Sequence, residues 1–172
     1  DMFSTHFYPG HPLGRPIQGT EGTVGGFSRR RLLRYFRENY VPDNILIVAA
    51  GNVRHATLAR LLAKTFGRMP RVRKVASPGL PPRPRGGIVT SPKKELEQLH
   101  LLMGVPAFPE RHTRRYPLFV LTALLGGTMS SRLFQKVREE RGLAYSVYSA
   151  VNAFADSGVM MVYAGTSPDR GD

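Results

Sequence analysis

The first half of the chain alternates hydrophobic and polar positions with the period of a helix in two places. In residues 28–40 apolar side chains recur every three or four positions, with arginines on the opposite face: Leu32, Leu33, Phe36 and Tyr40. Residues 53–67 repeat the pattern with Leu58, Leu61, Leu62 and Phe66, and Gly67 supplies a stop. The apolar run 44–51 between them predicts a strand buried on both faces.

The periodic pattern breaks off at residues 70–86, which contain five prolines and several arginines. Proline stiffens a chain and removes backbone donors, so this composition is typical of an extended linker. The sequence therefore predicts three parts: residues 1–69, the linker 70–86, and residues 87–172.

After the linker the pattern resumes with short strands and helices. Strict alternation predicts strands, apolar runs with a late glycine predict helices, and the turn residues 155–158 predict a hairpin. The expected elements are strands at 87–91 and 97–107, helices at 114–127 and 130–141, and strands at 143–154 and 159–166. Helices mixed with antiparallel strands indicate the α+β class.

The charge of the chain is strongly positive. Lysine and arginine number 25 against 12 acidic residues, a net charge of +13. Arginines in residues 28–37 keep a basic nucleic-acid-binding domain open as an alternative. No zinc-finger or RNA-recognition signature accompanies them, and basic residues occur along the whole chain, which favours a solvated surface and no nucleic-acid partner. No apolar run reaches the roughly 18 residues of a membrane span.

Residues that could bind a metal or act as a nucleophile are few. The chain has no cysteine, which excludes disulfides and thiolate sites. None of its five histidines forms H-x-x-x-H or H-x-x-E-H, and His6 and His11 are separated by a Pro-Gly turn. No G-x-S-x-G is present, and Ser130 and Ser131 are expected to cap a helix. We therefore predict that this chain binds no metal by itself.

Arg138 and Tyr145 form the most suggestive pair. Arg138 lies near a predicted helix end and Tyr145 at the start of the next strand, and Gly142 lets the chain reverse between them. Two such donors, placed side by side, can hold a carbonyl and stabilise the oxyanion that forms when it is attacked. The alternative is structural, since cations are favourable near a helix C-terminus and tyrosine suits strands. Spacing alone leaves both interpretations open.

Four ordered segments resemble a known family. They are HPLGRPIQGT, Y-x-P-x-N followed by G-N-V, LLGGTMSSRLFQKVREERGLAYSV, and D-S-G-x-x-x-x-Y-A-G-T-S-P. The chain thereby resembles the zinc metallopeptidases related to mitochondrial processing peptidase, insulin-degrading enzyme and pitrilysin, in their bacterial branch. The resemblance implies a clamshell of two α+β domains, each an antiparallel sheet with helices on one side. In the family the first half binds zinc through H-x-x-E-H and a later glutamate.

The resemblance also implies what this chain contributes. Residues 1–69 match the end of the first domain and residues 87–172 the start of the second, zinc-free domain. Arg138 and Tyr145 match the family's catalytic arginine and tyrosine, and Gly126 and Gly127 a glycine-rich turn of the substrate chamber. Zinc is expected in a longer parent protein and not in this chain, which is not expected to hydrolyse peptides alone. The alternative to a peptidase fragment is a non-catalytic subunit with the same fold, which binds peptides or partners.

The expected partners follow from the same resemblance. They are a peptide substrate and either the remainder of the parent protein or a second copy of the chain. The bacterial branch implies a bacterial protein of the cytoplasm or periplasm.

Overall fold

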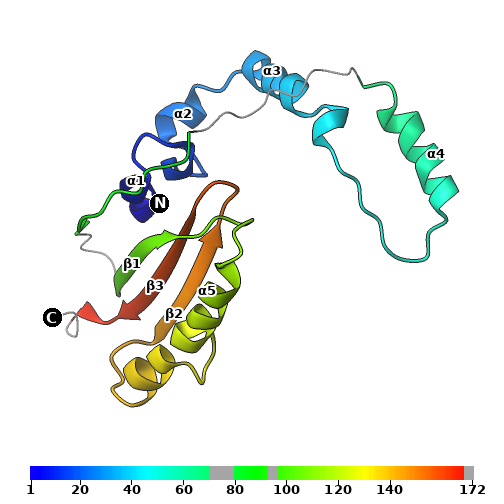
Figure 1. Ribbon diagram of the computed structural model, residues 1–172. Coiled ribbons are helices and arrows are strands. Elements are labelled where there is room, and N and C mark those ends of the chain that lie inside the picture. The colour runs from blue at the N-terminus through cyan, green and yellow to red at the C-terminus, as the bar shows by residue number, and fades with distance from the viewer. Residues whose placement is uncertain (70–79, 93–96, 169–172) are drawn as a thin grey trace. The chain divides into compact units, whose positions relative to one another are not determined.

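The computed structural model describes residues 1–69, 80–92 and 97–168 (Figure 1). The chain forms two compact units. The sheet unit comprises Asp1–Ile17 and Gly79–Asp172, and the helical unit comprises Gln18–Pro78. Helices and antiparallel strands occur as predicted, so the α+β class is confirmed.

The helical unit contains both amphipathic helices that the sequence predicts. Its elements are α2 (Glu21–Gly25), α3 (Arg29–Asn39), the short 3-10 helix η2 (Pro42–Asn44) and α4 (His55–Phe66). The hydroxyl of Ser28 accepts a hydrogen bond from the nitrogen of Arg31 at 3.3 Å, which caps α3.

The strand predicted at residues 44–51 is wrong. Apart from the last residue of η2, the segment forms neither helix nor strand, and Leu46 is 88% exposed. No strand lies beside it among the described residues of the helical unit, so its backbone groups have no ladder to join. The short strand predicted at residues 87–91 is wrong for the same reason, since these residues also form no ladder.

The sheet unit is built on three antiparallel strands. They are β1 (Leu99–Ala107), β2 (Ser146–Ala153) and β3 (Gly158–Thr166), in the spatial order β1-β3-β2. The hairpin β2–β3 closes through the nitrogen of Phe154, which donates to the oxygen of Ser157 at 2.7 Å. The predicted strand at 97–107 and the predicted hairpin are both confirmed.

On one face of the sheet, helical segments that precede β2 in the chain pack against β2. They are α5 (Arg115–Thr122) and two segments with wide π-helical turns, η3 (Ala123–Gly127) and η4 (Phe134–Glu139) (Figure 1). The hydroxyl of Ser149 in β2 donates to the oxygen of Thr122 at 2.8 Å, which ties this layer to the sheet.

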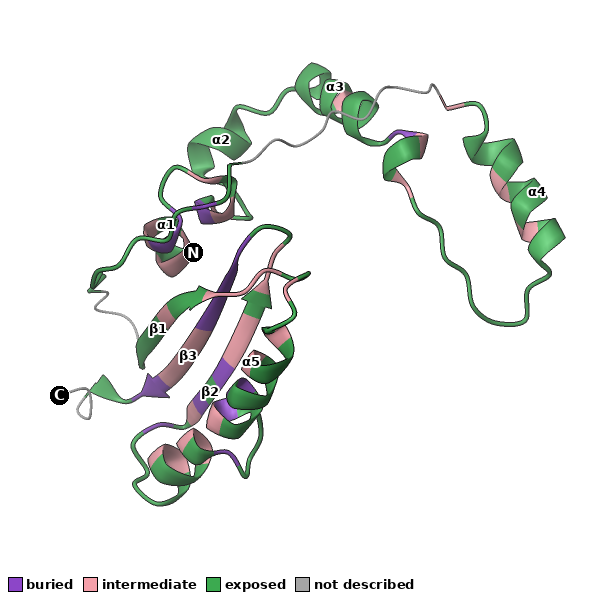
Figure 2. Ribbon diagram, viewed as in Figure 1, coloured by how far each residue is buried: buried purple, intermediate pink, exposed green. Residues whose placement is uncertain are grey.

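The other face carries α1 (Met2–Phe7), followed by the short η1 (Pro12–Gly14). A Cβ built on Gly104 of β1 would lie 2.3 Å from the ring of Phe3, so α1 packs directly on the strand. Phe7, Tyr8 and Val159 form the buried centre of this contact, and Figure 2 shows the buried positions along β3 and α1.

Because α1 packs on the sheet, the compact units differ from the domains that the sequence predicts. Residues 1–17 belong to the sheet unit, although the sequence groups residues 1–69 together. Of the predicted linker, residues 70–79 lie outside the described residues, while residues 80–86 form neither helix nor strand. The division into 1–69, 70–86 and 87–172 stays a prediction.

Candidate functional site

Arg138 and Tyr145 lie together in the structure. The guanidinium carbon of Arg138 lies 5.1 Å from the centre of the Tyr145 ring and 4.7 Å from that of Phe134. Both distances fall within the range of cation–π interactions. Phe134 and Arg138 belong to η4, whereas Tyr145 lies in the connection to β2. The sequence places Phe134 one helical turn before Arg138, but it was not predicted as a residue of the site.

The connection that carries Tyr145 is fixed at both ends. Gly142 adopts φ +58°, a left-handed conformation that favours glycine, and its nitrogen donates to the oxygen of Arg138 at 3.1 Å. The nitrogen of Leu143 donates to the oxygen of Val137 at 2.9 Å. These bonds close the end of η4 and turn the chain toward the sheet.

The same connection is attached to the end of β3. The nitrogen of Tyr145 donates to the oxygen of Gly165 at 3.1 Å, and the hydroxyl of Thr166 donates to the oxygen of Leu143. The backbone of Tyr145 is therefore fixed while its side chain stays 73% exposed, available to a ligand.

The charges around Arg138 leave it largely unneutralised. Its Nε lies 3.6 Å from Oε1 of Glu139, and the two side chains are 37% and 52% exposed. An ion pair this exposed contributes little. A second pair, Lys136 with Glu140 at 2.8 Å, spans the same helical turn. Arg138 thus keeps its positive charge available beside the phenol of Tyr145.

Gly126 and Gly127 have different surroundings. Gly126 is buried, and a Cβ on it would lie 2.5 Å from the nitrogen of Ser149, so the contact of η3 with β2 requires a glycine there. Gly127 is exposed, and a Cβ on it would meet nothing nearer than 3.4 Å. This gives Gly126 a packing role, whereas contact of either glycine with substrate stays a prediction.

The predicted capping by Ser130 and Ser131 is wrong. The hydroxyl of Ser131 is buried and has no hydrogen-bond partner among the described residues, and that of Ser130 meets Thr128 at 3.1 Å. Instead the side-chain amide of Gln135 donates to the oxygen of Met129 at 2.7 Å. This bond ties the helix to the preceding turn, but a donating amide does not cap the first N–H groups of the helix.

The histidines do not assemble into a metal site. Nδ1 of His11 accepts from the nitrogen of Leu13 at 3.2 Å, and Nδ1 of His100 lies 2.8 Å from the hydroxyl of Tyr163. Within residues 1–69, 80–92 and 97–168, no three histidine or acidic side chains gather in a way that could hold a metal ion.

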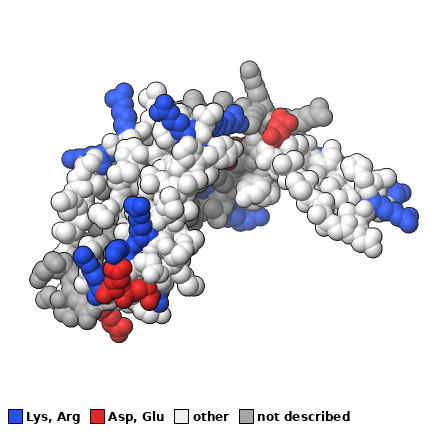
Figure 3. Space-filling view, turned by 60° about the horizontal axis from the view of Figure 1, so that its bottom comes forward, with Lys and Arg blue, Asp and Glu red and all other residues white. Residues whose placement is uncertain are grey.

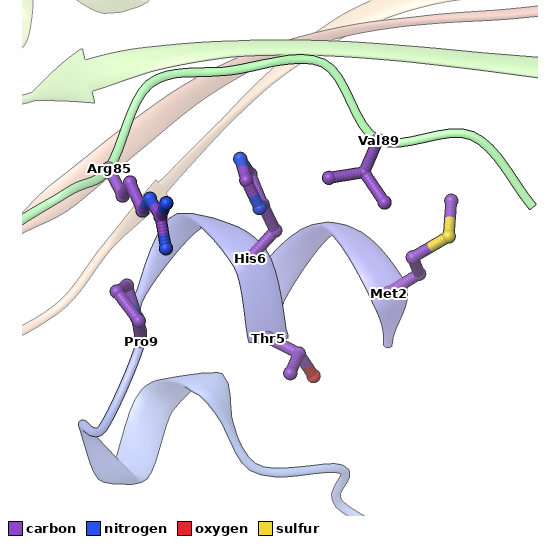
Figure 4. Close-up of a pocket in the computed structure, with 6 residues that line it drawn as sticks. All are labelled: Met2, Thr5, His6, Pro9, Arg85 and Val89. Atoms are coloured by element: carbon purple, nitrogen blue, oxygen red, sulfur yellow. The ribbon is translucent and has the colours of Figure 1, made fainter.

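His6 lies in a hollow between α1 and the chain at residues 85–89. Figure 4 shows its ring rising from α1 toward that chain, with Arg85 on one side and Met2 and Val89 on the other. Nε2 of His6 is buried without a hydrogen-bond partner among the described residues. A Cβ on Gly87 would approach this nitrogen to 2.9 Å, so the ring of His6 packs against the backbone at Gly87.

Basic side chains stand at several places on the face drawn in Figure 3, and acidic side chains lie beside one group of them. Four arginines of α3 border one shallow hollow, namely Arg29, Arg30, Arg34 and Arg37. In the part of the chain that the structure describes, no helix is both long and apolar enough to pass through a membrane.

Residues 26–172 match the family description "Peptidase M16 inactive domain". The chain belongs to the M16 peptidase family. The resemblance identified from the four sequence segments is therefore confirmed, and the M16 domain matched is the one described as inactive.

Bacterial zinc proteases are similar to this M16 chain over almost all of its length. An uncharacterized zinc protease of Mycobacterium leprae is 43% identical over 177 residues, which cover 99% of this chain and 39% of that protein. One from Streptomyces coelicolor is 39% identical, covering 99% and 38% respectively. The chain thus spans about two fifths of the length of these relatives.

Solved structures show the same M16 fold. A peptidase M16 inactive domain from Pseudomonas fluorescens superimposes with a TM-score of 0.84 at 21% identity, covering 96% of this chain and 40% of that one. A protease from Helicobacter pylori gives 0.83 at 20% identity, covering 98% and 41%. A chain of complex III from Candida albicans gives 0.78 at 20% identity, covering 96% and 41%.

Proposed function

We propose that this chain is part of a zinc-dependent endopeptidase, to which it contributes scaffold and a substrate clamp formed by Arg138 and Tyr145. The observation that supports it most is the 5.1 Å contact between the Arg138 guanidinium and the Tyr145 ring, on a backbone fixed by hydrogen bonds to β3. In this proposal residues 87–172 begin the zinc-free domain and residues 1–69 end the domain before it. The similar bacterial proteins named zinc proteases support the activity.

The two side chains suit a peptide carbonyl. The Nη groups of Arg138 and the hydroxyl of Tyr145 are hydrogen-bond donors on neighbouring groups. A hydrogen bond to the carbonyl oxygen becomes stronger when that oxygen becomes negatively charged during attack. This lowers the barrier to the reaction. A permanent positive charge on arginine makes its hydrogen bond to an oxyanion stronger than a neutral one. The clamp would thus orient the scissile bond and stabilise its tetrahedral intermediate.

Zinc does not fit the residues of this chain that the structure describes, since they contain no cluster of three ligands. In the proposed enzyme the metal belongs to another part of the parent protein. The role of this chain is then limited to binding, orienting and donating hydrogen bonds, and its isolated form is expected not to cleave peptides.

Tyr145→Phe in the full-length protein tests this proposal. Loss of an oxyanion donor typically lowers kcat by about 10²- to 10³-fold. We expect a drop of this order in peptide cleavage, at unchanged zinc content measured by atomic absorption. Tyr148→Phe is the matched control, because this tyrosine is also solvent-exposed, at 49%, and lies in β2 three positions after Tyr145. Unchanged turnover in Tyr145→Phe would remove this residue from the site.

A second candidate is a non-catalytic subunit of the same fold. It is favoured by the matched description, which calls the domain inactive, and by the similarity to a chain of complex III. The two candidates differ upstream of Asp1. An intact H-x-x-E-H there, with zinc bound in the purified full-length protein, supports the peptidase. A full-length protein without zinc and without peptide cleavage supports the subunit.

A further inference from the structure

Two aromatic rings from different elements share the guanidinium of Arg138. Phe134 lies one helical turn before it in η4, at 4.7 Å, and Tyr145 approaches from the following connection, at 5.1 Å. We propose that Phe134 is a positioning residue that holds Arg138 against Tyr145 with its donors directed at the substrate. This inference rests on the proposed function, because it assigns Phe134 a part in the same clamp.

Arg138 needs such a support. An arginine side chain has several rotatable bonds and loses considerable rotamer freedom when it is fixed. Its ion pair with Glu139 is long, at 3.6 Å, and both partners are exposed, so it cannot supply the restraint. No hydrogen bond joins the Arg138 side chain to another of the described residues. The two ring contacts are therefore the interactions that restrain it.

Ring contacts restrain a guanidinium without consuming its donors. A guanidinium can stack with its flat face on an aromatic ring while its N–H groups donate in its own plane. The Nε side of Arg138 faces Glu139, which leaves the two Nη groups for a carbonyl oxygen. Contacts of this kind favour the held conformation by a few-fold at exposed sites and by about thirtyfold when water is excluded. Substrate binding, which excludes water, would strengthen the clamp.

The first test measures the restraint in the 172-residue chain itself. The Hε proton of Arg138, observed by 1H–15N NMR, is expected to be shifted by the ring current of Phe134. Phe134→Leu keeps an apolar side chain but removes the π-face, so the signal should move toward that of an unrestrained arginine. Phe134→Tyr keeps the ring and should preserve the shift. Phe119→Leu on α5 is the matched control and should leave the signal in place. A signal that Phe134→Leu does not move overturns the inference.

The second test measures catalysis in the full-length protein. Phe134→Leu should lower kcat about three- to thirtyfold with little change in KM, Phe134→Tyr should restore it, and Phe119→Leu should have no effect. Thermal unfolding of each variant identifies any that fold poorly. If Tyr145→Phe abolishes cleavage but Phe134→Leu does not reduce it, the positioning role is wrong and the proposed function stands. If neither variant affects cleavage, the proposed function fails, and the NMR result alone decides whether Phe134 orders Arg138.

Discussion

Gly126 in η3 packs against the backbone of Ser149 in β2 so closely that a Cβ on Gly126 would lie 2.5 Å from the Ser149 nitrogen. The φ of Gly126 is −158°, which any residue can adopt, so the requirement for glycine is one of space. We expect Gly126→Ala to force η3 away from the sheet and to lower the free energy of unfolding by about 1–3 kcal/mol, the usual cost of overpacking. Chemical denaturation of the 172-residue chain measures this change.

Gly127→Ala is the matched control, because a Cβ there would meet only ordinary contacts beginning at 3.4 Å. Its effect should stay within about 0.5 kcal/mol. Equal losses at both positions would contradict the packing role of Gly126. In the full-length protein, loss of peptide cleavage by Gly127→Ala at unchanged stability would instead support the predicted contact with substrate.

Gly142 provides the second prediction. Its φ of +58° turns the chain from η4 toward the sheet, and a side chain in this conformation costs about 1–2 kcal/mol. Asparagine tolerates the left-handed region better than alanine does. Thermal unfolding should therefore show that the unchanged chain is the most stable, Gly142→Asn is less stable, and Gly142→Ala is the least stable. Equal stability of the alanine variant would show that the turn relaxes without cost.

Structural elements that depend on neighbouring residues in the sequence could be predicted. The hairpin β2–β3 follows from alternation around a turn, and the reversal at Gly142 brings Arg138 beside Tyr145, as its position between a helix and a strand suggests. The catalytic meaning of that pair came from the family resemblance, because a cation at a helix end is equally well explained by the helix dipole.

Elements that depend on distant partners could not be predicted. Residues 44–51 have the composition of a strand but no ladder among the described residues of their unit, and composition does not reveal partners. The packing of Phe3 over Gly104 joins residues about one hundred positions apart, and no periodicity encodes it. The wide turns of η3 and η4 likewise share the apolar pattern of ordinary α-helices.

The outer strand β1 predicts association of the isolated chain. On the face opposite to Gly104 it presents alternating apolar side chains that are 37% to 67% exposed: Leu99, Leu101, Met103 and Val105. An edge strand with such a face pairs readily with another copy. We expect light scattering to show dimers or larger species that increase with concentration.

Val105→Lys should reduce that association, because a charge on the apolar face must be desolvated when copies pair. Leu102→Lys is the control, since Leu102 points to the other face of the same strand and is similarly exposed, at 40%. A monodisperse monomer for the unchanged chain, or the same loss of association with both variants, would contradict the role of this face.

Tyr8 predicts a loss of stability at alkaline pH. Burial raises the pKa of its phenol above the ordinary value of 10.0, the neighbouring Ser157 hydroxyl lowers this pKa in part, and the charge of Asp156 raises it further. The two hydroxyl oxygens nevertheless do not meet in hydrogen-bond geometry. A folded-state pKa above the unfolded one means that the folded chain holds this proton more tightly. The associated stability is complete below pH 10 and is lost as the pH rises through the folded-state pKa.

Tyr8→Phe should therefore flatten the decline of stability above pH 10. At pH 7 the variant should be as stable as the unchanged chain or more stable, since it removes a buried hydroxyl without a hydrogen-bond partner, which costs about 1–3 kcal/mol. Urea unfolding at pH values from 7 to about 11 measures both effects. Tyr148→Phe is the comparison, because this phenol is about half exposed, at 49%. Of these two phenols, only that of Tyr8 is buried. If both variants lose stability equally above pH 10, groups other than Tyr8 cause the decline.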